Sequence, residues 1–143
     1  MKKLFKFLTV AILAVAATVA CVLAVGCDKD KDKGGSSDYN FTIVYEDGKA
    51  VNGDTAGVDG GKVATQICLP GENGLCIRLS GMHKIFPDAN GKLSFTQAKI
   101  NELFGSSTDV TVFSFHVMNM PGYKSDCEVE VTGKGNYTVT VTK

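Results

Sequence analysis

Imidazole and thioether side chains gather in two short stretches of this sequence, and together they could bind a soft metal ion. Met82 and His83 are adjacent, and His116, Met118 and Met120 alternate within HVMNM. Because the side chains of a strand alternate between its faces, His116 and Met118 would share one face. Imidazole with thioether ligands suits copper. His83, His116 and Met118 are therefore candidate ligands of an extracytoplasmic copper-binding protein, and ordinary exposed strand residues are the alternative interpretation.

The cysteines offer a second kind of chemistry. Cys68 and Cys76 flank the turn signal PGENG between two apolar runs. Outside the cytoplasm such a pair can close a disulfide across adjacent strands, and two buried thiols are the alternative. Cys127 alternates with Val129 and Val131, which indicates a third, buried thiol. The sequence has no CxxC motif and no Cys/His spacing typical of zinc sites, so no metal cofactor is expected from the cysteines.

Sequence motifs give little support to catalysis. There is no GxSxG, no HExxH and no P-loop, and the chain has two histidines. Asp88, Asn90 and Gly91 resemble the middle of a calcium loop, but Phe86 and Gln97 stand where carboxylates are needed, so a turn is expected. We therefore predict a non-enzymatic protein without a cofactor.

Binding of sugars or calcium would depend on a few other side chains. The chain has no tryptophan, so a stacking platform for a glycan would use tyrosine or exposed phenylalanine. Tyr123 follows Pro-Gly in an expected loop and is the best placed of the four tyrosines. Asp47, Asp54 and Asp59 could gather around calcium at one end of the domain.

The N-terminal segment is typical of an export signal. Residues 1–26 carry a basic head, MKKLFK, and then an apolar run that ends in small residues. The LAVG directly before Cys27 resembles the lipobox of bacterial lipoproteins, although Ala24 stands where that family has leucine. The resemblance implies a diacylglycerol on the Cys27 sulfur, cleavage before Cys27, and a place on the outer face of the cytoplasmic membrane. An uncleaved transmembrane helix is the alternative, and it puts the domain on the same side.

The charge after Cys27 limits the partners of this chain. Twelve basic and fifteen acidic residues leave a net charge near −3. The only dense lysines alternate with aspartates in DKDKDK, whereas nucleic acid requires a clustered basic surface, so this partner is excluded. Alternating charge with Gly and Ser predicts a flexible tether over 27–39 that leads to a domain over 40–143.

Short alternating stretches dominate the domain. Strands are predicted over 41–45, 62–69, 75–80, 109–118, 127–131 and 137–143, with a turn and a short strand over 88–95. One helix is predicted after Thr96, with Ile100, Leu103 and Phe104 on its apolar face and Gly105 as its stop. These elements predict an all-β fold, a small antiparallel β-sandwich with one inserted helix.

The order of the turn motifs adds a family resemblance. YEDGKAV, PDANGKLSF, PGY and a closing NYTVTVTK follow one another along the chain. This order resembles the prealbumin-like domains of bacterial surface proteins, the Cna-B and carboxypeptidase-regulatory-like modules, and an Ig-like Greek key is the related alternative. The helical segment, about 97–108, departs from that family, and the residues of its Lys–Asn isopeptide bond are missing. We expect a surface lipoprotein that binds or presents a glycan or another protein.

Overall fold

The computed structural model describes residues 37–143. The predicted signal segment 1–26, the predicted lipid attachment at Cys27 and the tether as far as residue 36 lie outside the described residues. Within residues 37–143, no helix is long and apolar enough to cross a membrane.

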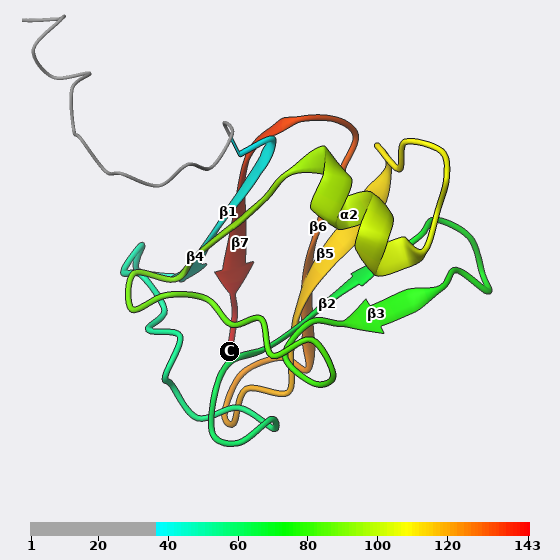
Figure 1. Ribbon diagram of the computed structural model, residues 1–143. Helices are drawn as coiled ribbons and strands as arrows, with labels where there is room; N and C mark the ends of the chain where they lie inside the picture. The colour runs from blue at the N-terminus through cyan, green and yellow to red at the C-terminus, as the bar shows by residue number, and fades with distance from the viewer. Residues whose placement is uncertain (1–36) are drawn as a thin grey trace, which may run out of the picture. The chain divides into compact units, whose positions relative to one another are not determined.

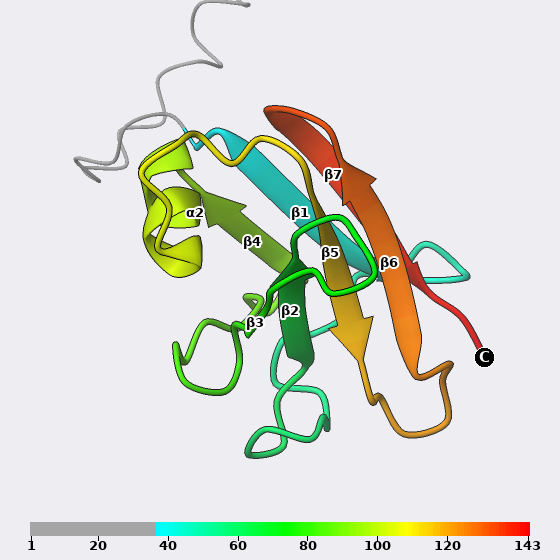
Figure 2. The ribbon, with the colours of Figure 1, turned by 90° about the vertical axis from the view of Figure 1, so that its right-hand side faces the viewer.

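In the described part of the chain, seven strands form two sheets that face each other, with one short helix beside them (Figures 1 and 2). The first sheet has the order β4-β1-β7, with β4 at Lys92–Phe95, β1 at Tyr39–Tyr45 and β7 at Gly135–Val141. The second sheet has the order β3-β2-β5-β6, with β3 at Cys76–Arg78, β2 at Ala64–Cys68, β5 at Phe113–Met118 and β6 at Asp126–Val131. The fold is therefore the small β-sandwich that the sequence predicts.

One strand pair differs from the predicted antiparallel arrangement. β1 and β7 run parallel, in a register that pairs Tyr39 with Gly135 and Tyr45 with Val141. The other four pairs are antiparallel. Since β1 and β7 are the first and last strands, no short turn fixes their direction, and local sequence signals carry no information about it.

Aromatic rings from both sheets meet at the centre of the core. Phe41 of β1 is 1% exposed, and its ring stacks on Phe115 of β5 with centroids 4.2 Å apart. Tyr137, Phe95 and Phe113 surround the same ring at centroid distances of 5.7, 6.1 and 6.4 Å. The stack of Phe41 on Phe115 therefore joins the two sheets.

The predicted helix forms where its capping residues place it. α2 spans Gln97–Phe104, and the Thr96 side chain accepts a hydrogen bond from the Lys99 backbone N–H at 3.2 Å. Gly105 ends the helix in the left-handed conformation, at φ 62°, which glycine adopts without a steric penalty. Ile100, Leu103 and Phe104 are buried, as their spacing predicts.

The strand predicted over 109–118 is shorter than expected, because β5 begins only at Phe113. Side chains of α2 form hydrogen bonds with the backbone of the segment before β5, where the strand is expected to begin. Asn101 accepts a hydrogen bond from the Val110 N–H at 3.1 Å, and Gln97 donates one to the Val110 carbonyl at 2.8 Å. These bonds replace the ladder that would have extended the strand.

The sandwich begins slightly before the predicted boundary at residue 40. Tyr39 is fully buried in β1, and its hydroxyl donates to the Gln97 side chain at 2.6 Å. Asp38 accepts a hydrogen bond from the Gln97 N–H at 2.7 Å and lies 3.1 Å from the Lys134 ammonium. These contacts hold the pKa of Asp38 below its ordinary value. Residues 38 and 39 therefore belong to the folded domain.

Cys68 and Cys76 face each other across the β2–β3 hairpin and are joined by a disulfide. Their Cα atoms are 4.1 Å apart. The third cysteine of the described part, Cys127, is a buried free thiol in β6.

Replacing both Cys68 and Cys76 by alanine is expected to lower the free energy of unfolding by about 2–3 kcal/mol, because the unfolded chain loses a closed loop. Urea denaturation with and without a reductant measures this effect. Reductant should lower the midpoint of the wild type to that of the double variant and leave the double variant unchanged. Equal midpoints for the wild type under both conditions would contradict the prediction.

Candidate functional site

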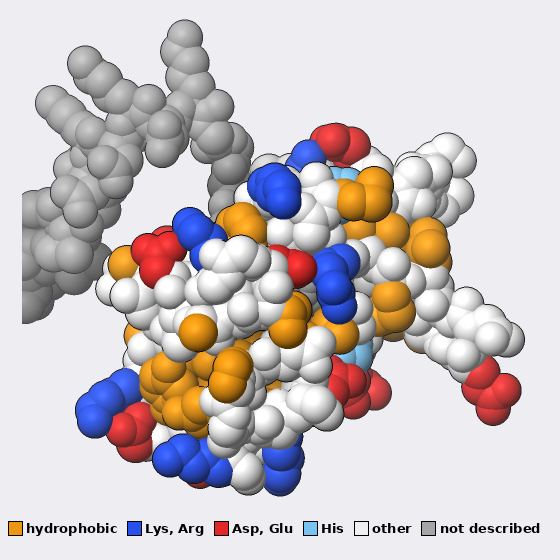
Figure 3. Space-filling model, turned by 90° about the horizontal axis from the view of Figure 1, so that it is seen from below, with side chains coloured by type: hydrophobic (Ala, Val, Ile, Leu, Met, Phe, Trp, Pro, Cys, Tyr) orange, Lys and Arg blue, Asp and Glu red, His pale blue; other side chains and the backbone are white. Residues whose placement is uncertain are grey.

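Four strands point toward the same end of the sandwich, which we call the distal end. β1, β3, β5 and β7 all run toward it, whereas the described chain starts at the opposite end, next to Tyr39 (Figure 1). The distal end carries the loops 46–63, 79–91 and 119–125 and the last residue of the chain. Seen from this side, hydrophobic side chains lie among Lys, Arg, Asp and Glu side chains (Figure 3).

Two tyrosines meet at the distal end. Tyr45 closes β1 and Tyr123 lies in the turn between β5 and β6, with ring centroids 5.4 Å apart. The Lys124 N–H donates to the Thr142 carbonyl at 2.7 Å, which holds this turn against the end of β7. Both tyrosines line a hollow of about 370 Å³ with four charged side chains, Glu46, Asp47, Lys49 and Lys143. This set of residues is called the tyrosine hollow below.

Two of the four charged side chains of the tyrosine hollow pair with each other. The Lys49 ammonium lies 2.9 Å from the Asp47 carboxylate, and the Lys49 N–H donates to the same side chain at 3.0 Å. These two hydrogen bonds hold the pKa of Asp47 below its ordinary value, and Asp47 raises the pKa of Lys49. Both groups are therefore charged at neutral pH. The Lys143 ammonium lies 5.9 Å from the centroid of the Tyr123 ring.

A second hollow lies at the distal end, on the side of the 79–91 loop. It has a volume of about 430 Å³, and Val58 and Phe86 supply its apolar lining. The Lys62 ammonium lies 5.2 Å from the centroid of the Phe86 ring. This hollow has one aromatic ring, whereas the tyrosine hollow has two.

A group of polar side chains lies on the outer face of the second sheet. Phe113, Phe115 and Val117 of β5 point into the core, so Ser114 and His116 point outward. His116 stands directly opposite Glu128 of β6. Its Nδ1 lies 2.9 Å from Asp126 Oδ1 and 3.4 Å from Glu128 Oε2, and its Nε2 lies 2.6 Å from Ser114 Oγ. His116, Asp126 and Glu128 are called the histidine cluster below.

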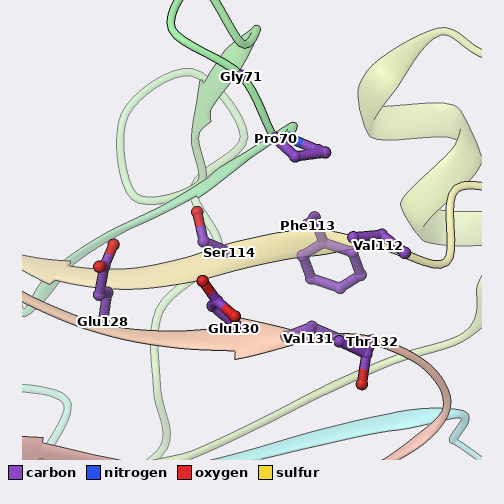
Figure 4. A pocket seen from close by; sticks show the side chains of 9 residues that line it. All are labelled: Pro70, Gly71, Val112, Phe113, Ser114, Glu128, Glu130, Val131 and Thr132. Atoms are coloured by element: carbon purple, nitrogen blue, oxygen red, sulfur yellow. The ribbon is translucent and has the colours of Figure 1, made fainter.

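The chain Ser114–His116–Asp126 has the hydrogen-bond order of a nucleophile, a base and an orienting acid. Acyl transfer also requires donors aimed at the oxyanion that develops. β5 is paired on both sides, so its ladder uses the backbone N–H groups around Ser114. Beside Ser114 lies a groove of about 360 Å³ whose charged lining is Glu128 and Glu130 (Figure 4). Such a lining repels an oxyanion and attracts a cation.

The three predicted copper ligands come from β5 and from the loop after β3. His116 and Met118 share the outer face of β5, as predicted. His83 is exposed in the loop after β3 and is not part of the histidine cluster.

The aspartates considered for calcium have separate partners. Asp47 pairs with Lys49, Asp54 lies 3.0 Å from the Lys62 ammonium, and Asp59 accepts a hydrogen bond from Ser80. Asp88 accepts hydrogen bonds from the N–H groups of Asn90 and Lys92, as expected for a turn.

Sequence reasoning missed Asp126 and Glu128 as partners of His116. Their alternation with Cys127 and Val129 does place them on one face, but only the β5–β6 register brings that face next to the histidine. Likewise, Tyr123 is predicted as a loop residue, but its contact with Tyr45 depends on the parallel pairing of β1 with β7.

The chain matches no protein-family model, no curated protein and no solved structure. The function is therefore argued from the geometry of the described residues.

Proposed function

We propose that this protein is a membrane-anchored surface lipoprotein whose β-sandwich binds a glycan at the cell envelope, without catalysing a reaction. The tyrosine hollow is the observation that carries the proposal. Its volume of about 370 Å³ lies within the range of roughly 300–1,000 Å³ typical of small-molecule sites.

The lining of the tyrosine hollow suits a sugar. A sugar ring has apolar C–H faces and a rim of hydroxyl groups. The rings of Tyr45 and Tyr123 offer apolar surface, and the charged pair of Asp47 and Lys49 offers both acceptors and donors for hydroxyl groups. Binding sites that combine aromatic surface with a few fixed polar groups have this composition.

The position of the tyrosine hollow favours a ligand away from the membrane. β1 starts next to the proposed tether and ends at Tyr45, so its seven residues separate the two by about 20 Å. If Cys27 carries the lipid, the residues between Cys27 and Tyr39 add a spacing on the order of 20 Å. The hollow would then be accessible to wall glycans.

The turn that carries Tyr123 contains one of the sequence motifs on which the proposed family resemblance rests. The PGY motif of residues 121–123 is one of the elements shared with prealbumin-like surface modules. In this chain Gly122 has a φ of 81°, which allows the tight turn that presents Tyr123 to Tyr45. We therefore propose that this motif has a binding role here.

Replacing Tyr123 by alanine is expected to weaken glycan binding about tenfold or more, since an aromatic contact at the centre of a small site typically contributes more than 1 kcal/mol. The measurement is calorimetric titration of soluble wall glycan fragments into the purified protein. Tyr123→Phe keeps the ring and should keep most of the affinity.

Phe86→Ala is the matched control, because Phe86 is the aromatic residue of the second distal hollow. This variant should bind glycan like the wild type. If Phe86→Ala loses affinity and Tyr123→Ala does not, the tyrosine hollow is not the site. If the wild type binds no glycan fragment, the proposal of a glycan ligand fails.

A further inference from the structure

The histidine cluster combines one buried ring with two exposed carboxylates. The His116 side chain is 9% exposed, whereas the side chains of Asp126 and Glu128 are 52% and 59% exposed. One ligand atom from each residue lies within 4.8 Å of the other two. The three atoms therefore converge on one point at the sheet surface, with the histidine fixed and the carboxylates able to adjust.

Ser114 determines which ring nitrogen faces the carboxylates. Its Oγ lies 2.6 Å from His116 Nε2 and holds the ring in one orientation. In the tautomer with a proton on Nε2, the ring donates to Ser114, and the lone pair of Nδ1 points toward Asp126 and Glu128. Histidines that bind metal ions commonly have this arrangement, in which the other ring nitrogen donates to an oxygen.

The surroundings of the histidine cluster carry uncompensated negative charge. Asp126, Glu128 and Glu130 all lie on the outer face of β6. Within residues 37–143, His116 is the only basic side chain within 4.0 Å of Asp126 or Glu128, and Glu130 has none. In the tautomer with its proton on Nε2, the lone pair of Nδ1 and the two carboxylates all face the same point, so together they would attract a cation placed there.

We propose that His116 Nδ1, Asp126 and Glu128 bind a divalent transition-metal ion of the zinc type on the outer face of the second sheet. Ligand distances of about 2.0–2.2 Å in a tetrahedral zinc site separate the ligand atoms by roughly 3.4 Å. The observed separation of 3.4 Å between His116 Nδ1 and Glu128 Oε2 already meets this value. A small rotation of the exposed Asp126 side chain completes the set, and a fourth position stays open to water.

The ligand types select the class of metal. One imidazole with two carboxylates suits Zn²⁺, Mn²⁺ or Ni²⁺ better than Cu(I), which prefers thioether and thiolate sulfur. Ions can approach along the groove of about 360 Å³, where Figure 4 shows Glu128 and Ser114 on the side of the sheet opposite the Phe113 ring. The two carboxylates of this groove, Glu128 and Glu130, attract cations to it.

The test is calorimetric titration of ZnCl₂ into the purified protein, with thermal melting as a second readout. We expect one ion per chain and a rise in Tm of about 10 °C when free Zn²⁺ exceeds its Kd a hundredfold. Glu128→Gln should weaken binding at least tenfold with little effect on the fold, because the side chain is exposed. His116→Gln should abolish binding.

Two matched controls separate this site from general attraction of cations. Glu130→Gln removes a carboxylate from the same face of the same strand, and His83→Gln removes the other histidine. Both variants should bind Zn²⁺ within about twofold of the wild type. An equal loss in Glu130→Gln and Glu128→Gln would overturn the proposal, and so would the absence of wild-type binding at about 1 mM Zn²⁺. Metal-independent hydrolysis of p-nitrophenyl acetate that Ser114→Ala abolishes would overturn it in favour of a nucleophilic site.

Discussion

Phe41→Ala is expected to lower the free energy of unfolding by about 3–5 kcal/mol. The ring is 1% exposed and stacks on Phe115 across the two sheets, so its removal leaves a cavity that backbone movement in only one sheet cannot fill. A domain of this size has a total stability of roughly 5–15 kcal/mol. We therefore expect a fall in Tm of about 15 °C or more, or a chain that is largely unfolded at 37 °C. The fall in Tm is measured by thermal melting, with circular dichroism as the signal.

Two further variants test whether the effect comes from the packing of the aromatic stack. Phe41→Leu retains most of the side-chain volume. It should lower the free energy of unfolding by less than about half as much as Phe41→Ala does. Val112 is 47% exposed next to the same strand as Phe115, and Val112→Ala should change stability by no more than about 0.5 kcal/mol. If Phe41→Ala loses as little stability as Val112→Ala, the two sheets are not joined through the Phe41 ring.

Local signals predict most elements of this fold because they act within a few residues. Thr96 and Gly105 fix both ends of α2 through hydrogen bonds to its own first and last turns. Alternation in β7 places Val139 and Val141 inside, each 1% exposed. Contacts between separate elements determine the other boundaries. Residues 109–112 form no strand, because the side chains of Gln97 and Asn101 in α2 form hydrogen bonds with the Val110 backbone.

The candidate sites depend still more on long-range contacts. Alternation predicts that His116 and Glu128 both point outward, but their pairing depends on the register across the 119–125 turn. The tyrosine hollow needs both that turn and the parallel pairing of β1 with β7, which brings Tyr45 next to Tyr123. A sequence pattern specifies the face of a strand on which a side chain lies, and only the register specifies its neighbour.

Cys27→Ala is expected to remove all covalent lipid from the protein. The proposed lipobox would make the Cys27 sulfur the attachment point, and each buried methylene of an acyl chain contributes about 0.8 kcal/mol to membrane binding. Two or more chains would therefore hold the domain firmly at the membrane surface. Intact mass of protein extracted from membranes measures this directly. The wild type should begin at Cys27 with added diacylglycerol, and Cys27→Ala should begin at Met1 with no added mass.

Cys21→Ala is the matched control, since Cys21 lies in the same apolar segment, six residues before Cys27. This variant should keep the lipid and the start at Cys27. The alternative of an uncleaved helix predicts a wild-type chain that begins at Met1 and is unaffected by either substitution. Loss of lipid in Cys21→Ala alone would move the attachment point and lengthen the tether by six residues. In every case the tyrosine hollow stays at the end of β1 opposite Tyr39, because both ends of this strand lie within the folded domain.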